Sequence, residues 1–232
     1  AEPYFWKAMP AAVQSIKALQ QAFRDRNMEV LFTTIESLTL NGRDRSLDYK
    51  ISGFNVPRGS WDGKVLDEVA PLGDEIVLPK TSCSVFISTN LPYILRNLGI
   101  KQVVLVGGLT DQCVESAVRD ACDMGFLVTQ VTDACYTMSH ERHAASVRAI
   151  KGFCRQRTSA QLLEELADLP AAPPWRACGF REGSGPLPEE DDDEEGAEEE
   201  DAGDVSVDAG QEEPPIKRHR GRRGGRKHNK KG

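Results

Sequence analysis

Cys113 is the residue of this sequence best placed to act as a nucleophile. It follows "KQVVLVGG" (residues 101–108), a short β-branched run typical of a buried parallel strand. The residues after it carry apolar side chains at helical spacing, at Val114, Ala117, Val118, Ala121 and Cys122. Cys113 therefore lies in the first turn of a predicted helix, where unpaired backbone N–H groups favour a thiolate. The alternative is a buried structural cysteine.

The start and the end of this helix also have sequence signals. Thr110 or Asp111 is expected to cap its first turn, because a side-chain oxygen can accept from a free backbone N–H group. Gly125 is a suitable residue to end the helix. The cap would fix the turn that carries Cys113.

Lys80 is the residue expected to lie beside this thiol. It ends the predicted strand "DEIVLPK" (residues 74–80), while Glu36 follows the predicted strand "MEVLFTTI" (residues 28–35). Pockets of open parallel sheets form beyond the carboxyl ends of the strands, where these residues should meet Cys113. A nearby ammonium group stabilises a thiolate. The alternative for Lys80 alone is an exposed loop lysine.

Strands and helices alternate through the first 169 residues. Strands are predicted at residues 28–35, 74–80, 101–108 and 126–134, and helices at 9–26, 62–70, 90–100, 110–124, 140–153 and 159–169. This order predicts an α/β fold: a three-layer α/β/α domain with a mainly parallel, doubly wound sheet and a disordered C-terminal tail. The first helix has no strand before it, so we expect an N-terminally incomplete domain whose missing strand lies upstream of Ala1.

Charge is segregated along the chain and divides it into four segments. Residues 1–169 form the predicted folded domain, and residues 170–188 form a linker rich in Pro and Gly. An acidic segment (189–215) holds 15 Asp and Glu residues, and a basic tail (216–232) holds 9 Lys and Arg residues. The remainder is almost neutral, so nearly all of the formal net charge of −7 belongs to the tail. Neither charged segment can build a core.

The basic tail leaves three roles open. It can be a flexible tail shielded by the neighbouring acidic run, a nuclear-targeting signal, or a contact for nucleic-acid phosphates. The absence of interleaved aromatic residues argues against base recognition. Nucleic acid is therefore not expected to be its main partner. We expect a cytoplasmic protein because its scattered cysteines indicate reduced thiols, with a nuclear one as the alternative from the basic C-terminus.

Cysteine spacing and hydropathy exclude several classes of protein. The six cysteines are scattered without a CxxC pair, which indicates reduced thiols rather than a zinc site or a disulfide framework. No apolar stretch approaches the roughly 20 residues of a membrane span, and the N-terminus does not resemble a secretory signal. A membrane partner is therefore not expected.

Two motifs give the chain a resemblance to a known family. "LPKTSCSVF" and "LRNLGIKQVVLVGGLTDQCVESAVRDACDMGFLVTQVTDAC" closely resemble the isochorismatase-like cysteine hydrolases, and the similarity spans roughly residues 9–166. The resemblance implies hydrolysis of a small amide, ureido or carbamoyl compound by a Cys-Lys-Asp triad. It assigns the nucleophile to Cys113 and the triad lysine to Lys80. It also implies a cis peptide bond at Gly108–Leu109 and an oxyanion hole formed by the N–H groups of Leu109 and Cys113.

The stretch "GSWDGKVLDEVAP" resembles the ureidoacrylate and carbamoyl amidohydrolase branch of this family. By this resemblance Trp61 walls the substrate pocket and Glu36 accepts a substrate N–H. The alternatives are a packed core aromatic residue and a surface carboxylate. The family also suggests a homo-oligomer.

The same reading predicts no metal and no cofactor. His140 and His143 could suggest a metal, but two imidazoles without a third ligand are more often surface or packing residues. The Asp and His set of metal-dependent nicotinamidases is not found between residues 35 and 62. The resemblance therefore implies a metal-independent amidohydrolase.

The triad aspartate has no matching residue in this chain. In the family it ends the first strand, ahead of the first helix. Two hypotheses follow: a cysteine hydrolase whose aspartate lies outside this chain, or a catalytically inactive scaffold whose charged tail binds protein or nucleic acid.

Overall fold

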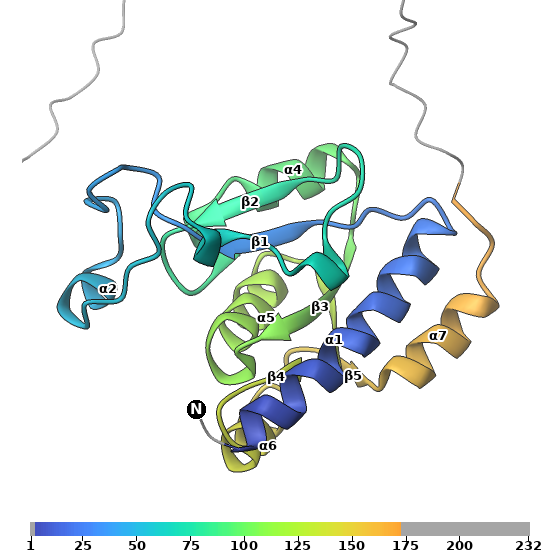
Figure 1. The fold of residues 1–232 in the computed structure, drawn as a ribbon. Coiled ribbons are helices and arrows are strands. Elements are labelled where there is room, and N and C mark those ends of the chain that lie inside the picture. The colour runs from blue at the N-terminus through green and yellow to red at the C-terminus, as the bar shows by residue number, and fades with distance from the viewer. Residues whose placement is uncertain (1–2, 173–232) are drawn as a thin grey trace, which may run out of the picture. The chain divides into compact units, whose positions relative to one another are not determined.

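A computed structural model describes residues 3–172 (Figure 1). The predicted acidic segment and basic tail lie outside these residues, as does all but the start of the predicted linker. No helix among residues 3–172 is long and apolar enough to cross a membrane. The following description concerns this part of the chain.

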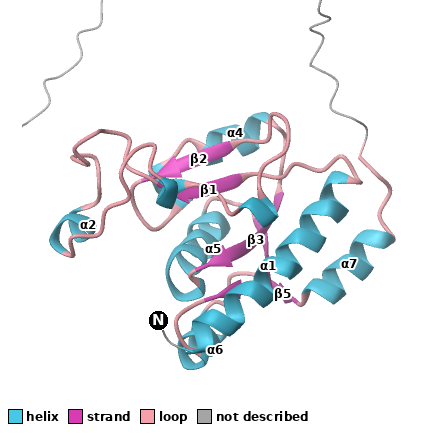
Figure 2. Cartoon of the chain, in the orientation of Figure 1, coloured by secondary structure: helices cyan, strands magenta, loops and turns pink. Residues whose placement is uncertain are grey.

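Helices and strands alternate as the hydrophobic pattern predicts. The helices are α1 (Pro3–Arg24), α2 (Leu47–Ile51), α3 (Val85–Ser88), α4 (Leu91–Asn97), α5 (Glu115–Asp123), α6 (His140–Ala149) and α7 (Ser159–Ala167). The strands are β1 (Phe32–Ile35), β2 (Val77–Lys80), β3 (Gln102–Gly108), β4 (Leu127–Tyr136) and β5 (Arg155–Arg157). The long connection between β1 and β2 is mostly loop (Figure 2).

Every strand pair is parallel, but the strands form two separate groups. β1 pairs with β2, and β3, β4 and β5 pair in that order. Among the described residues no strand joins β1 to β3. The predicted parallel sheet is therefore confirmed, and it has a break between β1 and β3.

Helices cover both faces of the larger group, which gives the three predicted layers. Side chains of α3, α4 and α5 pack with Val128 and Cys135 of β4 in one buried cluster. Side chains of α1 and α7 pack with Val131 and Ala134 of the same strand in the other. Side chains alternate along a strand, which places Val128 and Val131 on opposite faces and does the same for Ala134 and Cys135. Val128 and Cys135 share a face because the register of β4 against β3 shifts between Gln130 and Cys135. Helices α1 and α7 lie side by side (Figure 1).

Three local predictions differ from the structure. Residues 62–70 form two short 3₁₀ turns (Trp61–Gly63 and Asp67–Val69) rather than a helix. Strand β5 has the sequence RQR, which contains no apolar residue, so it lacks the apolar alternation from which a strand is predicted. Helix α1 begins at Pro3 and not at residue 9.

A slot separates the two strand groups. A cavity of about 560 Å³ is lined by β1 and the residues before it, by β3, by apolar side chains of α1 such as Ile16, and at one end by Lys80 and Cys113. Val103 to Val106 of β3 are only partly buried, whereas Val128 and Val131 of the neighbouring β4 are almost fully buried. The break in the sheet therefore leaves apolar strand residues incompletely covered.

Candidate active site

Lys80 and Cys113 are brought into direct contact. The Nζ atom of Lys80 lies 3.3 Å from the Sγ atom of Cys113 and donates a second hydrogen bond to the carbonyl of Ser82 at 2.9 Å. Lys80 is only 3% exposed, whereas Cys113 is partly exposed. An ammonium group held out of water at this distance favours the anionic form of the sulfur. The thiol is thus accessible to a small molecule and electrostatically supported.

Cys113 lies in a tight turn that links β3 to α5. A π-helical turn (Thr110–Val114) precedes the regular helix, and the Gly108–Leu109 peptide bond before it is cis, as expected from the family resemblance. Turns of this type recur at functional sites. The N–H of Val114 donates to the carbonyl of Leu109 at 3.2 Å, which closes the turn around Cys113.

The turn is anchored by α6 rather than by a side-chain cap. The buried Thr110 hydroxyl lies 3.0 Å from Nδ1 of His143, and the Ser146 hydroxyl donates to the carbonyl of Thr110 at 3.2 Å. Burial, followed by the charge of His140, lowers the pKa of His143, which favours its neutral ring. His143 is therefore a packing residue that holds the turn.

The prediction that Asp111 caps the helix is wrong. Its carboxylate instead accepts from the Thr137 hydroxyl and forms an ion pair with Arg142 at 2.5 Å. Burial acts against ionisation, but these two hydrogen bonds hold the pKa of Asp111 below its ordinary value. Asp111 thus joins the turn to the end of β4 and to α6, and no side chain caps the turn.

Cys83 is a site residue that the sequence did not single out. Burial, the nearby Cys113 sulfur and a hydrogen bond to that sulfur raise the pKa of the Cys83 thiol. Burial, followed by the charges of the nearby Cys83 and Cys113, raises the pKa of the Tyr49 hydroxyl. Tyr49 and Cys83 therefore lie near the Cys113 sulfur, and their raised pKa values keep both protonated near neutral pH. The three-residue spacing between Lys80 and Cys83 in "LPKTSCSVF" was the available signal.

Gly108 is required by close packing. The strand register places it opposite Tyr136, and a Cβ atom added to Gly108 would lie 2.6 Å from two ring atoms of that tyrosine. Burial raises the pKa of the Tyr136 hydroxyl, so the ring stays neutral. The glycine thus allows the aromatic ring to pack against the backbone just before Leu109.

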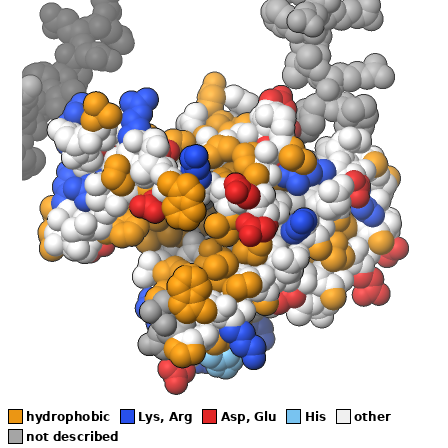
Figure 3. All heavy atoms as spheres, viewed as in Figure 1, with side chains coloured by type: hydrophobic (Ala, Val, Ile, Leu, Met, Phe, Trp, Pro, Cys, Tyr) orange, Lys and Arg blue, Asp and Glu red, His pale blue; other side chains and the backbone are white. Residues whose placement is uncertain are grey.

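Glu36 and Trp61 are not brought to the Cys113 cavity. Glu36 lines a smaller cavity, where its carboxylate accepts from the backbone N–H of Gly59 and so holds the loop after β1. Trp61 is 78% exposed and does not line the cavity that contains Cys113 (Figure 3 shows the exposed hydrophobic side chains of one face). Their predicted roles in substrate binding remain predictions.

No carboxylate is in hydrogen-bond contact with the Cys113 sulfur among residues 3–172, where the sulfur accepts from Lys80. Within the same residues no group of three His, Cys, Asp or Glu side chains is gathered as a metal-ligand set. The arrangement can attack a carbonyl carbon with sulfur, and it can stabilise negative charge there through Lys80.

Comparison with known families and sequences gives consistent matches. An isochorismatase domain matches residues 7–161. The ureidoacrylate amidohydrolase RutB of Acinetobacter baylyi is 37% identical over 105 residues, which cover 45% of this chain and 43% of that protein. RutB of Agrobacterium fabrum is 37% identical over 87 residues, or 38% of each protein. The chain thus matches less than half of the length of these curated relatives.

Solved structures of the same fold cover more of the chain. A cysteine hydrolase from Pseudomonas syringae pv. phaseolicola superposes with a TM-score of 0.65 at 22% identity, over 69% of this chain and 82% of that one. An N-carbamoylsarcosine amidase from Thermoplasma acidophilum superposes with a TM-score of 0.57 at 26% identity, over 66% of this chain and 85% of that one.

Proposed function

Because the chain belongs to the isochorismatase family and resembles its ureidoacrylate amidohydrolase branch, we propose that it is a cysteine-dependent hydrolase of a small amide, ureido or carbamoyl compound. The observation that carries the proposal is the 3.3 Å contact between the buried Lys80 ammonium and the Cys113 sulfur. The names of two relatives, ureidoacrylate amidohydrolase and N-carbamoylsarcosine amidase, support the substrate class.

The proposed reaction proceeds through a thioester. The Cys113 thiolate attacks the carbonyl carbon, the amine or ammonia leaves with a proton, and water then hydrolyses the thioester. Lys80 stabilises the sulfur anion before attack and the developing charge during it. The N–H groups of Leu109 and Cys113 are the proposed oxyanion donors, and the Leu109 N–H has no backbone acceptor among the described residues.

A general base is also needed, to accept the thiol proton and later to activate water. The described residues supply no carboxylate at the sulfur, so we assign this role to an aspartate outside residues 3–172. Loss of a general base typically lowers rates by about 10²- to 10⁴-fold. Acylation of the nucleophile by an activated ester depends less on this group and can be tested on the chain itself.

The test is acylation by p-nitrophenyl acetate, followed by peptide mapping of the acyl group. We expect a burst of p-nitrophenol and a thioester on Cys113, both lost in Cys113→Ser and kept in Cys122→Ser, a matched change in the following helix. Ammonia release from ureidoacrylate, N-carbamoylsarcosine and simple carboxamides then ranks the substrates. Equal acylation of all the cysteines would contradict the proposal and favour the inactive-scaffold alternative.

A further inference from the structure

We propose that Tyr136 is a further catalytic residue of this site, whose hydroxyl donates a hydrogen bond to the substrate carbonyl oxygen while Cys113 attacks the carbonyl carbon. The inference rests on the proposed hydrolase function. Tyr136 is the last residue of β4, and it lines the same cavity as Lys80 and Cys113. A hydroxyl in this place can contact a molecule that has reached the sulfur.

The register of the sheet places Tyr136 beside the turn that carries Cys113. Gly108, the last residue of β3, is opposite Tyr136. The hydroxyl oxygen of Tyr136 lies 3.0 Å from the position that a Cβ atom on Gly108 would occupy. Leu109 follows directly, and its N–H group is one of the two proposed oxyanion donors. The hydroxyl is therefore close to the place where negative charge would develop on the carbonyl oxygen.

Packing on two sides holds the Tyr136 ring in place. The backbone of Gly108 contacts the ring, as the missing Cβ requires. Phe5 of α1 packs against the ring edge to face, with centroids 5.8 Å apart and ring planes at 70°. A donor that is fixed before the reaction needs no reorganisation when charge develops, and such donors contribute most to the rate.

The Tyr136 hydroxyl is available as a donor. Burial, followed by the charges of Cys135 and Cys113, raises its pKa, so the hydroxyl keeps its proton near neutral pH. Within residues 3–172 it has no hydrogen-bond partner that acts on this pKa. A partly buried hydroxyl without a protein partner can donate to a substrate atom and lose no existing contact.

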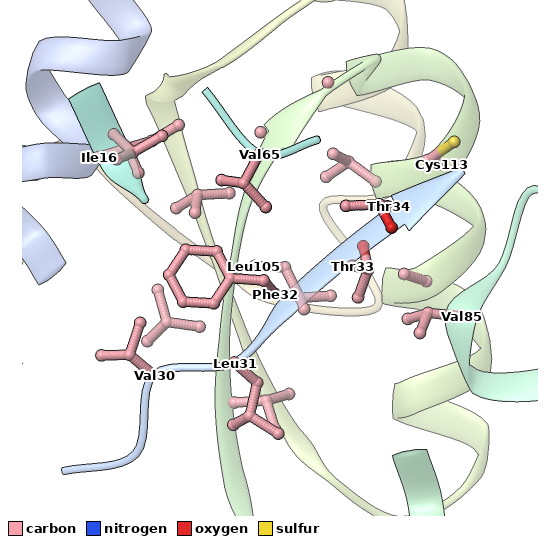
Figure 4. Close-up of a pocket in the computed structure, with 18 of the residues that line it drawn as sticks. Ile16, Val30, Leu31, Phe32, Thr33, Thr34, Val65, Val85, Leu105 and Cys113 are labelled. Carbon is pink, nitrogen blue, oxygen red and sulfur yellow. The ribbon is translucent and has the colours of Figure 1, made fainter. Parts of the chain in front are cut away.

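The other polar side chains at this end of the cavity are less suited to the role. Figure 4 shows Cys113 near Thr34 at one end and Val30 at the other. Lys80 already donates to the Cys113 sulfur at 3.3 Å. Thr34 belongs to β1, which pairs with no strand of the group that contains β3 in the described part of the chain. Its hydroxyl is therefore not fixed by the strand that carries the Cys113 turn, whereas Tyr136 is.

The proposed step needs no proton transfer from tyrosine. The thiolate sulfur forms a bond to the carbonyl carbon, and the electron pair of the C=O double bond moves to the oxygen. Tyr136 donates to this oxygen and keeps its proton. The double bond then forms again as the amine leaves with the proton that the base took from the thiol. An activated ester loses p-nitrophenolate instead, which needs no proton, so the tyrosine can be tested without the base.

The experiment compares two reactions of the same sulfur. Acylation by p-nitrophenyl acetate places negative charge on a carbonyl oxygen, whereas alkylation by iodoacetamide displaces iodide and does not. We expect Tyr136→Phe, which keeps the packed ring, to slow acylation of Cys113 by about tenfold or more and to leave alkylation unchanged. Tyr93→Phe changes an exposed tyrosine of α4 outside the cavity and should alter neither rate. Peptide mapping would assign both products, and circular dichroism would confirm the fold.

The outcomes separate this inference from the proposed function. Acylation of Cys113 at the same rate in Tyr136→Phe and in the unmodified chain would overturn the inference and leave the proposed function in place. Slowing of acylation and alkylation by the same factor would assign the hydroxyl to the thiolate, which also contradicts the inference. So would a loss of acylation found in Thr34→Val and not in Tyr136→Phe. No acylation of Cys113 in the unmodified chain would overturn the proposed function, and this inference with it.

Discussion

The Nζ atom of Lys80 and the Sγ atom of Cys113 lie 3.3 Å apart, although the two residues follow strands of different groups in the broken sheet. Lys80 ends β2, and Cys113 follows β3 in a π-helical turn. The carboxyl ends of the two groups thus meet at one point even where no strand connects them. This contact gives the first prediction.

Lys80→Met should slow the alkylation of Cys113 by iodoacetamide near neutral pH by about tenfold or more. A charge-assisted hydrogen bond stabilises its partner by about 1.5–3 kcal/mol, and this variant removes it from the thiolate. Peptide mapping over time would measure the rate at each cysteine. Lys101→Met removes an exposed lysine at the opposite end of β3 and should leave the rate unchanged. Equal rates in the two variants would show that the contact does not activate the thiol.

Cys83→Ala should reduce the reactivity of Cys113 by a factor of about two to ten, because it removes a neutral donor worth about 0.5–1.5 kcal/mol. The raised pKa of Cys83 keeps that thiol protonated near neutral pH, so it can donate to the Cys113 anion. Cys83→Ser keeps a donor, so the reactivity of Cys113 in this variant should stay closer to that in the unmodified chain. The alkylation assay serves here too, and an effect of Cys83→Ala no larger than that of Cys122→Ala would contradict the donor role.

Gly108→Ala should destabilise the fold by about 1–3 kcal/mol through the close approach of the new Cβ to the Tyr136 ring. Urea unfolding would measure the loss. Adding Tyr136→Ala should remove most of the cost, whereas Tyr136→Phe should not, since the contacting ring atoms remain. Gly152→Ala is the control, because its added Cβ has no atom within 4 Å. If the loss of stability persisted in the double variant Gly108→Ala with Tyr136→Ala, contact with the Tyr136 ring would not be its cause.

Asp111→Asn should lower the stability at neutral pH by about 1–2 kcal/mol and flatten its acid dependence. The folded-state pKa of Asp111 lies below its ordinary value, so the ion pair stabilises the fold above that ordinary value. This stabilisation is lost as the pH falls toward the folded-state pKa. Urea midpoints between pH 2 and 7 would reveal it (roughly the range in which carboxylates titrate). Asp120→Asn, which removes a carboxylate without a side-chain partner among the described residues, is the control and should leave the stability at neutral pH unchanged.

The sequence identified the elements of the site because their signals are local. The β-branched run before Gly108 and the helical spacing after Cys113 are short-range patterns, and they predicted β3 and α5 to within a few residues. Lys80 at the end of one predicted strand, and Cys113 in the first turn of the helix that follows another, predicted that the two residues meet. The carboxyl ends of parallel strands lie at the same edge of a sheet whatever the register between the strands, and this rule made the prediction possible.

Contacts between residues distant in the sequence were decided only by the tertiary structure. How the segments between strands pack over the sheet decides three features of the site: the approach of Cys83 to Cys113, the pairing of Asp111 with Arg142 and the exposure of Trp61. The break between β1 and β3 is of the same kind. The apolar periodicity of a strand predicts which of its faces is buried, but it does not predict which strand pairs with each of its edges. Edge pairing uses backbone groups that every residue shares, so no side-chain pattern records it.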